Sequence, residues 1–234
     1  MNNWSAPQRP NDYAEHTLVN AILEGDFPPG STLPGERTLA AELGVTRPTL
    51  REAIQRLTRD GWLTVQQGKP TRINDYWRDG GLNVLGALVH YPNHLPPGFI
   101  TNLLEVRLDL APAYTRAAIN NGNGAVVDFL KKHTDLADET AVYATYDWQL
   151  HRHLAIQSGN PIYILILNGF TDFHEQISHV YFSAPESRAR SRMFYAALLE
   201  TAVAQNADRA EIICREMMQE SVDLWQVIRE QNNE

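Results

Sequence analysis

One helix with a defined start and end restricts the fold of this chain more than any other feature. It lies in the stretch GVTRPTLREAIQRLTRDGWL, residues 44–63. Thr46 can cap its start, because a threonine hydroxyl accepts the free N–H groups of a first helical turn, and Pro48 is tolerated in that turn. Gly61 is well placed to end it. The apolar residues between them have the spacing of one buried helical face: Leu50, Ala53, Ile54 and Leu57.

The opposite face of this predicted helix is basic. Polar residues recur there at every fourth position: Arg47, Arg51, Gln55 and Arg59. Residues 37–72 hold seven basic side chains against three acidic ones, a net charge of +4. The whole chain carries −8, and the acidic excess falls in residues 79–234, with eleven basic and nineteen acidic residues. A small basic part joined to a larger acidic one is typical of nucleic-acid binding confined to one domain.

The neighbouring segments predict a winged helix-turn-helix. Helices are expected over residues 12–25 and about 36–43, separated by the loop FPPGSTLPGE. After the basic helix, WLTVQQGKPTRIN predicts two short strands around a turn. In this arrangement a helix fits the major groove of DNA, and a basic hairpin reaches the adjacent backbone or minor groove. Arg47 and Arg51 could pair with guanine edges or with phosphates, and a merely solvated arginine face is the alternative.

The rest of the chain predicts helices. Residues 77–98 are interrupted by Gly and Pro pairs, which favours a linker with one short helix. Beyond it we find no alternating strand pattern of useful length, and the periodicity predicts helices over 99–121, 124–140, 142–158, 161–182, 186–205 and 207–231. Turn-forming residues mark the breaks, in NNGNG, SGNP, SAPE and NA.

The predicted fold class is therefore mainly α, in two folded parts. A winged helix-turn-helix DNA-binding domain with a small β-hairpin wing is expected over residues 8–76, its helix-turn-helix at about 36–59. The linker occupies 77–98, and an all-helical bundle follows over 99–232. Short breaks between helices favour antiparallel packing in that bundle.

Facing helices of a bundle can leave room for a ligand between them. Aromatic and flexible side chains are candidates for lining such a cavity, although each can equally be plain core: Tyr114, Tyr163, Phe170, Tyr181, Phe182, Phe194, Tyr195, Met217, Met218 and Trp225. Arg107 differs, because it lies in NLLEVRLDLAPA, which is otherwise apolar on that face. A buried arginine needs an anion or a carbonyl, which either a protein carboxylate or a ligand could supply.

Several stretches carry a resemblance to a known family. LPGERTLAAELGVTRPTLREAI resembles the DNA-binding domain of GntR-family bacterial transcription factors. DGWLTVQQGKPTRINDYWRDGGLNVL, NLLEVR, SGNPIYILILNG and YFSAPESR resemble more narrowly the FadR, or fatty-acid metabolism regulator, subfamily. The similarity covers nearly the whole chain. It implies a homodimer that binds a near-palindromic operator in double-stranded DNA, with a helical effector domain that binds long-chain acyl-CoA.

The resemblance also implies a regulatory role and a set of site residues. Such a protein represses fatty-acid degradation genes, activates genes of unsaturated fatty-acid synthesis, and leaves DNA when it binds acyl-CoA. The DNA-contacting positions fall on Arg37, Thr46, Arg47, Thr49, Arg51, Gln67, Gly68 and Lys69. The effector-binding positions fall on Arg107, Tyr181, Tyr195, Ser221 and Trp225. The chain departs from the expected pattern at Gln67, in place of a histidine, and at Met217-Met218, in place of tyrosine-glycine.

A metal-dependent effector site is the alternative. Asp147 and His151 in DWQLH have the i, i+4 spacing of two ligands to one metal. Many effector domains of the wider GntR family resemble this, and hold a metal with that aspartate and three histidines for an organic-acid effector. The last two predicted helices contain no histidine, since none follows His179. We therefore expect no metal, and a hydrogen bond between Asp147 and His151 within the bundle.

Other classes of protein are disfavoured. The single cysteine, Cys214, allows no internal disulfide and suits a reducing cytoplasm. The first residues lack a signal-peptide core, and no window approaches the ~18 apolar residues of a membrane span, so a cytoplasmic protein without a membrane partner is expected. No residue pattern has nucleophile-elbow context, and we expect neither an enzyme nor a cofactor.

Overall fold

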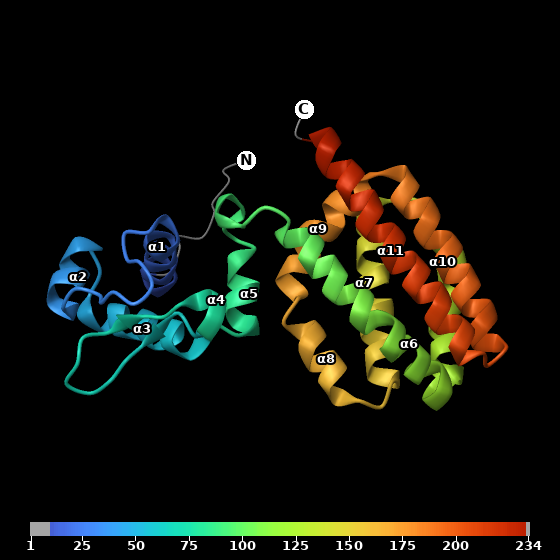
Figure 1. Cartoon of the computed structure of the whole chain (residues 1–234), viewed down its shortest axis with the longest axis horizontal. Helices are drawn as coiled ribbons and strands as arrows, with labels where there is room; N and C mark the ends of the chain where they lie inside the picture. The colour runs from blue at the N-terminus through green and yellow to red at the C-terminus, as the bar shows by residue number, and fades with distance from the viewer. Residues whose placement is uncertain (1–9, 233–234) are drawn as a thin grey trace, which may run out of the picture. The chain divides into compact units, whose positions relative to one another are not determined.

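The structure is a computed structural model that describes residues 10–232, with the side chains of all of these except 122, 123 and 229–232. The chain divides between Leu95 and Pro96 into two compact units, and most of both is helical (Figure 1). The fold class predicted from the sequence is confirmed. Residues 8 and 9 of the predicted N-terminal domain lie outside the described residues.

The N-terminal unit is a winged helix-turn-helix. Its elements, in chain order, are α1 Pro10–Glu24, α2 Glu36–Glu42, α3 Arg47–Asp60, β1 Leu63–Thr64, β2 Arg72–Ile73, α4 Tyr76–Asp79, α5 Leu82–Leu88 and a short 3₁₀ helix Pro92–His94. The two strands pair antiparallel, with Leu63 opposite Ile73. Helices α1 and α2 and strand β1 all pack against α3, which is the central element of this unit.

Helix α3 has the ends that its sequence predicts. The Thr46 hydroxyl accepts the backbone N–H of Thr49 at 3.3 Å. Gly61 takes a left-handed conformation with φ of 100°, and its N–H donates to the Leu57 carbonyl at 3.1 Å. Glycine adopts this conformation without the steric cost that a Cβ would add. The apolar face is buried as expected, in Leu50, Ala53, Ile54 and Leu57.

The wing is tied to the end of α3 by one amide side chain. Asn74 Nδ2 donates to the Gly61 carbonyl at 2.9 Å, and Asn74 Oδ1 accepts from the Thr64 hydroxyl at 2.7 Å. Trp62, which precedes the first strand, is 1% exposed and contacts the ring of Tyr76, with ring centroids 5.0 Å apart. The tip of the wing turns at Gly68, whose φ is 76°. These contacts fix the direction in which the hairpin leaves the helix.

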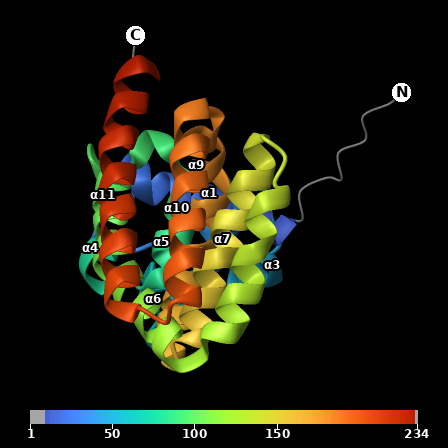
Figure 2. The same ribbon diagram turned by 90° about the vertical axis from the view of Figure 1, so that its right-hand side faces the viewer.

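The second unit is a bundle of helices. Its elements are α6 Phe99–Leu130, a 3₁₀ helix Lys131–Asp135, α7 Thr140–Gln157, α8 Pro161–Asn168, α9 Thr171–Ser183, α10 Pro185–Val203 and α11 Ala207–Asn232. Helix α6 packs against α7, α10 and α11, and Figure 2 shows α10 and α11 side by side. Large side chains without solvent exposure form the centre of the core: Tyr143, Leu150, Leu154, Tyr195 and Leu198.

Three predicted helix boundaries in the bundle are wrong, among them the end of the helix expected over 124–140, which stops at Leu130 before the 3₁₀ helix Lys131–Asp135. The break expected at NNGNG is absent, and α6 continues to Leu130. Ala118 and Val126 are both fully buried on either side of this segment, and Asn121 Nδ2 donates to the Ser158 carbonyl at 2.7 Å. These tertiary contacts outweigh the local turn preference. The helix expected over 161–182 is instead divided in two at Gly169.

The turn between α4 and α5 places Gly80 where no side chain fits. A Cβ there would lie 2.3 Å from the Tyr76 carbonyl oxygen and 2.9 Å from Cγ2 of Val84. We predict that Gly80→Ala lowers the free energy of unfolding by about 1–3 kcal/mol, because the backbone must shift. Gly81→Ala is the matched control, since a Cβ there meets nothing within 4 Å. Urea unfolding followed by circular dichroism gives both values, and equal stability of the two variants contradicts the assignment.

Candidate functional site

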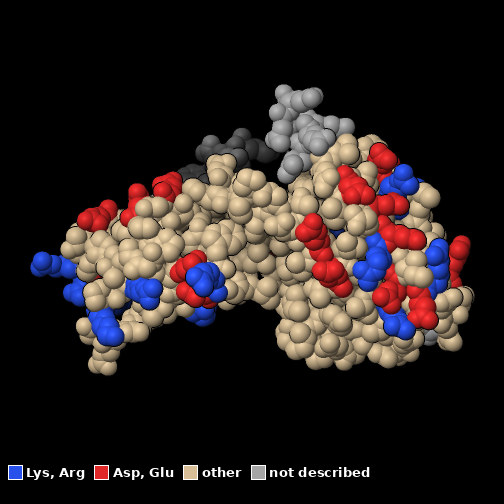
Figure 3. Space-filling view, in the orientation of Figure 1, with Lys and Arg blue, Asp and Glu red and all other residues tan. Residues whose placement is uncertain are grey.

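The predicted DNA-contacting residues lie on one surface of the N-terminal unit, here called the α3–wing surface. It comprises Arg37, Thr46, Arg47, Thr49, Arg51, Gln67, Gly68 and Lys69, all of them exposed except the half-buried Thr49. Figure 3 shows Lys and Arg of this unit gathered over α2, α3 and the wing. A protruding helix with an adjacent basic hairpin has the form of the major-groove readers among DNA-binding proteins.

One carboxylate on α2 holds the two central arginines of this surface. Glu36 Oε2 lies 2.7 Å from Nε of Arg51 and 3.6 Å from Nη2 of Arg47. Both arginine side chains remain more than half exposed, at 56% and 55%. Exposed ion pairs of this kind contribute little free energy, so phosphate or base oxygens can replace Glu36 at small cost.

Two other arginines of α3 have structural partners. Arg56 contacts Asp12 at 3.0 Å and Glu15 at 3.5 Å, which ties α3 to α1. Arg59 pairs with the adjacent Asp60 at 2.8 Å. The positive charge counted from the sequence is therefore divided: Arg47 and Arg51 share one exposed carboxylate on α2, whereas Arg56 joins α3 to α1 and Arg59 pairs within its own helix.

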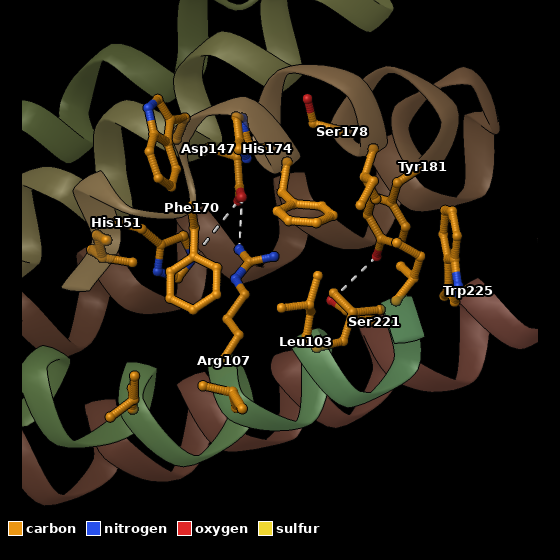
Figure 4. Close-up of a pocket in the computed structure, with 18 of the residues that line it drawn as sticks. Leu103, Arg107, Asp147, His151, Phe170, His174, Ser178, Tyr181, Ser221 and Trp225 are labelled. Atoms are coloured by element: carbon orange, nitrogen blue, oxygen red, sulfur yellow. Dashed lines mark hydrogen bonds and ion pairs between the residues drawn. The ribbon is translucent and has the colours of Figure 1, made fainter. Parts of the chain in front are cut away.

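The C-terminal unit contains a cavity between its helices (Figure 4). Its walls are mainly apolar, from α6, α8 and α9 with their flanking residues: Ile100, Leu103, Leu104, Leu110, Leu167, Phe170, Phe173, Ile177 and Phe182. Most of the polar groups gather at two places, around Arg107 and around Ser221, and Ser178 lies apart from both. An apolar cavity with a few placed polar groups is the usual form of a small-molecule site.

Arg107 has a protein carboxylate as its partner. Its Nη2 lies 2.7 Å from Oδ2 of Asp147, whose other oxygen accepts the Tyr195 hydroxyl at 3.0 Å. Burial raises the pKa of Asp147, but the Arg107 cation, the nearby imidazoles of His151 and His174 and the hydrogen bond from Tyr195 together lower it further, and the pKa lies below its usual value. The pair is therefore ionised, and it presents a partly exposed guanidinium to the cavity, with 27% of the Arg107 side chain accessible.

The predicted hydrogen bond between Asp147 and His151 is wrong. The two side chains approach only to 3.8 Å, because Asp147 already serves Arg107 and Tyr195. Nδ1 of His151 instead lies 2.7 Å from the hydroxyl of Tyr114. Burial lowers the pKa of His151 to about 3, and the imidazole is neutral at physiological pH.

The second polar group joins α9 to α11. The Tyr181 hydroxyl donates to Oγ of Ser221 at 3.3 Å, and Ser221 donates to the Met217 carbonyl at 2.8 Å. Trp225 lies one turn further along α11 and also lines the cavity. Met217 and Met218 are buried, at 7% and 2% exposure, and are not lining residues of this cavity.

The structure brings most of the predicted effector residues to this cavity. Arg107, Tyr181, Ser221 and Trp225 line it, whereas Tyr195 packs in the core and reaches the site only through Asp147. Of the other aromatic candidates, Tyr114, Phe170 and Phe182 line the cavity, and Tyr163 and Phe194 do not. Trp148, His174 and Ser178 also line the cavity. The sequence does not indicate this, because single polar or aromatic residues in predicted helices carry no sign of the face that they share.

Residues 10–232 contain no group of three or more His, Cys, Asp or Glu arranged to hold a metal ion. Cys214 is fully buried and accepts from the Thr115 hydroxyl at 3.4 Å, and burial raises the pKa of its thiol to about 12. None of the described helices combines the length and apolar character needed to cross a bilayer.

Comparison with known proteins gives consistent matches to both units. Residues 11–73 match the description "Bacterial regulatory proteins, gntR family", and residues 74–234 match "FadR C-terminal domain". The chain is 41% identical over 221 residues to the fatty acid metabolism regulator protein of Shewanella pealeana, covering 94% of this chain and 92% of that one. The protein of the same name from Serratia proteamaculans is 40% identical over 219 residues, with the same coverage.

A solved structure has the same fold at lower identity. Lar, which controls expression of the Listeria monocytogenes agr system, is 18% identical to this chain. The match covers 95% of this chain and 98% of Lar, with a TM-score of 0.57.

The Arg107–Asp147 pair generates a prediction about stability. Arg107→Leu leaves a buried carboxylate without its cation, and we expect it to lower the free energy of unfolding by about 3 kcal/mol. Arg116→Leu is the control on the same helix, because Arg116 is half exposed and pairs with Asp208, so its loss costs at most about 1 kcal/mol.

The double variant Arg107→Leu/Asp147→Leu separates charge from packing. It removes both buried charges and is expected to recover part of the lost stability. Urea unfolding of the three variants provides the comparison. If Arg107→Leu were no more damaging than Arg116→Leu, the pair would not be a buried ionic contact.

Proposed function

The chain belongs to the FadR group of the GntR family of bacterial regulatory proteins, and on this premise we propose that it is a homodimeric, acyl-CoA-responsive regulator of fatty-acid metabolism. The family makes it a DNA-binding transcription factor. In the proposed cycle, the free protein binds a near-palindromic operator, represses fatty-acid degradation genes and activates unsaturated fatty-acid synthesis genes. Long-chain acyl-CoA releases it from DNA. We place this cycle in the cytoplasm, without a membrane partner or a cofactor.

The α3–wing surface supports the DNA-binding half of the proposal. Arg47 and Arg51 lie in the first turns of a capped helix, and that end of a reading helix reaches base edges in the major groove. Lys69 and the exposed tip of the wing are suited to contact the adjacent backbone. Two copies related by two-fold symmetry would place two α3 helices in successive major grooves of one operator.

The cavity carries the effector half of the proposal. Its apolar walls suit an acyl chain, and Ser221 and Trp225 offer a hydrogen bond and a broad apolar face one helical turn apart. Arg107 adds a cation for carbonyl or anionic groups. Acyl-CoA has both kinds of group, whereas a free fatty acid lacks the nucleotide and pantetheine parts. By linkage, binding in the cavity releases DNA only to the extent that the two ligands favour different arrangements of the protein.

The domain organisation follows the same division. We propose residues 8–76 as the DNA-binding domain, 77–98 as the linker and 99–232 as the effector domain. The metal-dependent alternative gains no support from a specific contact, since both carboxylate oxygens of Asp147 are occupied by Arg107 and Tyr195.

Operator binding tests the assigned DNA surface. Arg47→Ala and Arg51→Ala should each weaken binding by about 1–3 kcal/mol, the value of a bidentate contact to a base edge. Arg59→Ala is the control, because it removes the same charge from the last turn of the same helix, where Arg59 pairs with Asp60. Fluorescence anisotropy with a labelled operator measures all three. Equal losses in the three variants would show that charge alone matters and would refute the assigned readout.

Release from the operator tests the effector assignment. Oleoyl-CoA should dissociate the operator complex, while oleate at the same concentration does so poorly. Trp225→Ala should bind DNA normally but need a higher oleoyl-CoA concentration for release, because it loses apolar contact in the cavity and none on DNA. Met193→Ala, on α10 and 65% exposed, should behave as the wild type. An operator complex that oleoyl-CoA leaves intact contradicts the proposal.

A further inference from the structure

The cavity contains a buried imidazole nitrogen without a hydrogen-bond partner among the described residues. His151 lines the cavity from α7 and is only 2% exposed. Its Nε2 makes no hydrogen bond with any described side chain or backbone group. Buried polar atoms are nearly always paired, so a ring nitrogen left free at the wall of a ligand cavity points to a partner on the ligand.

The neighbours of His151 determine which nitrogen carries the proton. On α6, the Tyr114 hydroxyl lies 2.7 Å from Nδ1 and supplies it with a donor. On α7, Oδ1 of Asp147 lies 3.8 Å from Nε2, beyond hydrogen-bond range but close enough to favour a proton there. Burial, the cation of Arg107 on α6 and the imidazole of His174 on α9 all oppose a second proton. We therefore assign the neutral tautomer with its hydrogen on Nε2, as a donor.

Asp147 does not reach this donor, because its Oδ1 lies 3.8 Å from Nε2 and the carboxylate is held where it is by two other side chains. Its Oδ2 is bound by Arg107 at 2.7 Å, and its Oδ1 by the hydroxyl of Tyr195 at 3.0 Å. Both partners come from other helices, α6 and α10, and hold the carboxylate in place. The Nε2 donor is left to whatever occupies the cavity.

The donor lies apart from the second polar group of the cavity. Figure 4 shows His151 beside Phe170 and Arg107 at one end, and Ser221 with Trp225 at the other. If the thioester oxygen of an acyl-CoA is bound at the Ser221 end, a plain hydrocarbon tail would run past His151 without offering an acceptor. A tail that carries its own oxygen would offer an acceptor to Nε2 of His151.

We propose that His151 is a specificity-determining residue that selects acyl-CoAs bearing an oxygen substituent on the acyl chain. The Nε2–H of His151 donates to a hydroxyl or keto oxygen of the chain. This inference rests on the proposed acyl-CoA site and names the class of acyl chain that the site prefers. Discrimination arises because a site with a buried donor loses that hydrogen bond when the ligand lacks the acceptor.

Calorimetry with a matched ligand panel tests the proposal. The panel is hexadecanoyl-CoA, which has no oxygen on its chain, 3-hydroxyhexadecanoyl-CoA, which has one near the thioester, and 16-hydroxyhexadecanoyl-CoA, which has one at the chain end. The wild type should bind one of the hydroxylated ligands about threefold to tenfold more tightly than the plain one, the range of a single hydrogen bond. The position of the preferred hydroxyl distinguishes the two orientations of the chain.

Two variants assign the preference to the His151 donor. His151→Phe should bind hexadecanoyl-CoA at least as well as the wild type and lose the preference, while His151→Gln, which keeps an N–H donor, retains part of it. His153→Phe is the control on the same helix, because His153 is half-buried, stacks on Phe129 and does not line the cavity. It should keep the full preference.

Each remaining outcome is decisive. If the wild type binds the three ligands equally, or His151→Phe keeps the preference, the proposal is wrong although the acyl-CoA site stands. If His151→Phe binds none of the three ligands, His151→Gln decides instead, because it keeps an N–H donor. Loss of the preference for a hydroxylated ligand in His151→Gln then overturns the donor role of His151. If the wild type binds no acyl-CoA at all, the proposed function fails and this inference fails with it.

Discussion

The ion pair between Arg107 and Asp147 is the interaction on which the C-terminal unit depends. It joins α6 to α7, and through the hydroxyl of Tyr195 the same carboxylate also holds α10. Because a buried charge is costly without its partner, these helices cannot close over the cavity or move apart without breaking a strong contact. The cavity thus persists beside a fixed polar centre. A ligand that reaches the Arg107 guanidinium must share it with Asp147.

The N-terminal unit uses the same chemistry in a different environment. Glu36 holds Arg47 and Arg51 much as Asp147 holds Arg107, but at the surface. Water screens the exposed pairs, so their contribution is small, and in the proposed DNA complex the carboxylate is displaced at little cost. Burial therefore decides the role of each acid: Asp147 maintains the shape of a site, whereas Glu36 orients side chains that remain free to exchange partners.

The sequence predicted best what local interactions determine. Helix α3 was predictable because Thr46, Gly61 and the apolar spacing act within a few residues of each other. The break expected in NNGNG failed because its turn preference is opposed by packing against α7, through the contact of Asn121 with Ser158. A turn preference that depends only on neighbouring residues does not include a contact with a partner 37 residues away.

In the candidate site too, the contacts that the sequence did not predict are those between residues far apart in the chain. The partner of Arg107 was left open between a protein and a ligand, since Asp147 is 40 residues distant. The i, i+4 spacing suggested that Asp147 would bind His151, but contacts from α6 and α10 take both of its oxygens. The resemblance named Ser221 and Trp225, and only the fold shows that they face the same cavity as His151. The unpaired Nε2 of His151 has no sequence signature.

Reciprocal linkage between the two sites is the most direct test of the account. The dissociation constant of the operator should be measured with and without saturating oleoyl-CoA, and that of oleoyl-CoA with and without saturating operator. If the cavity is the effector site of a DNA-binding protein, each ligand weakens the other, and by the same factor. Two dissociation constants that are each unchanged by the other ligand would contradict the account.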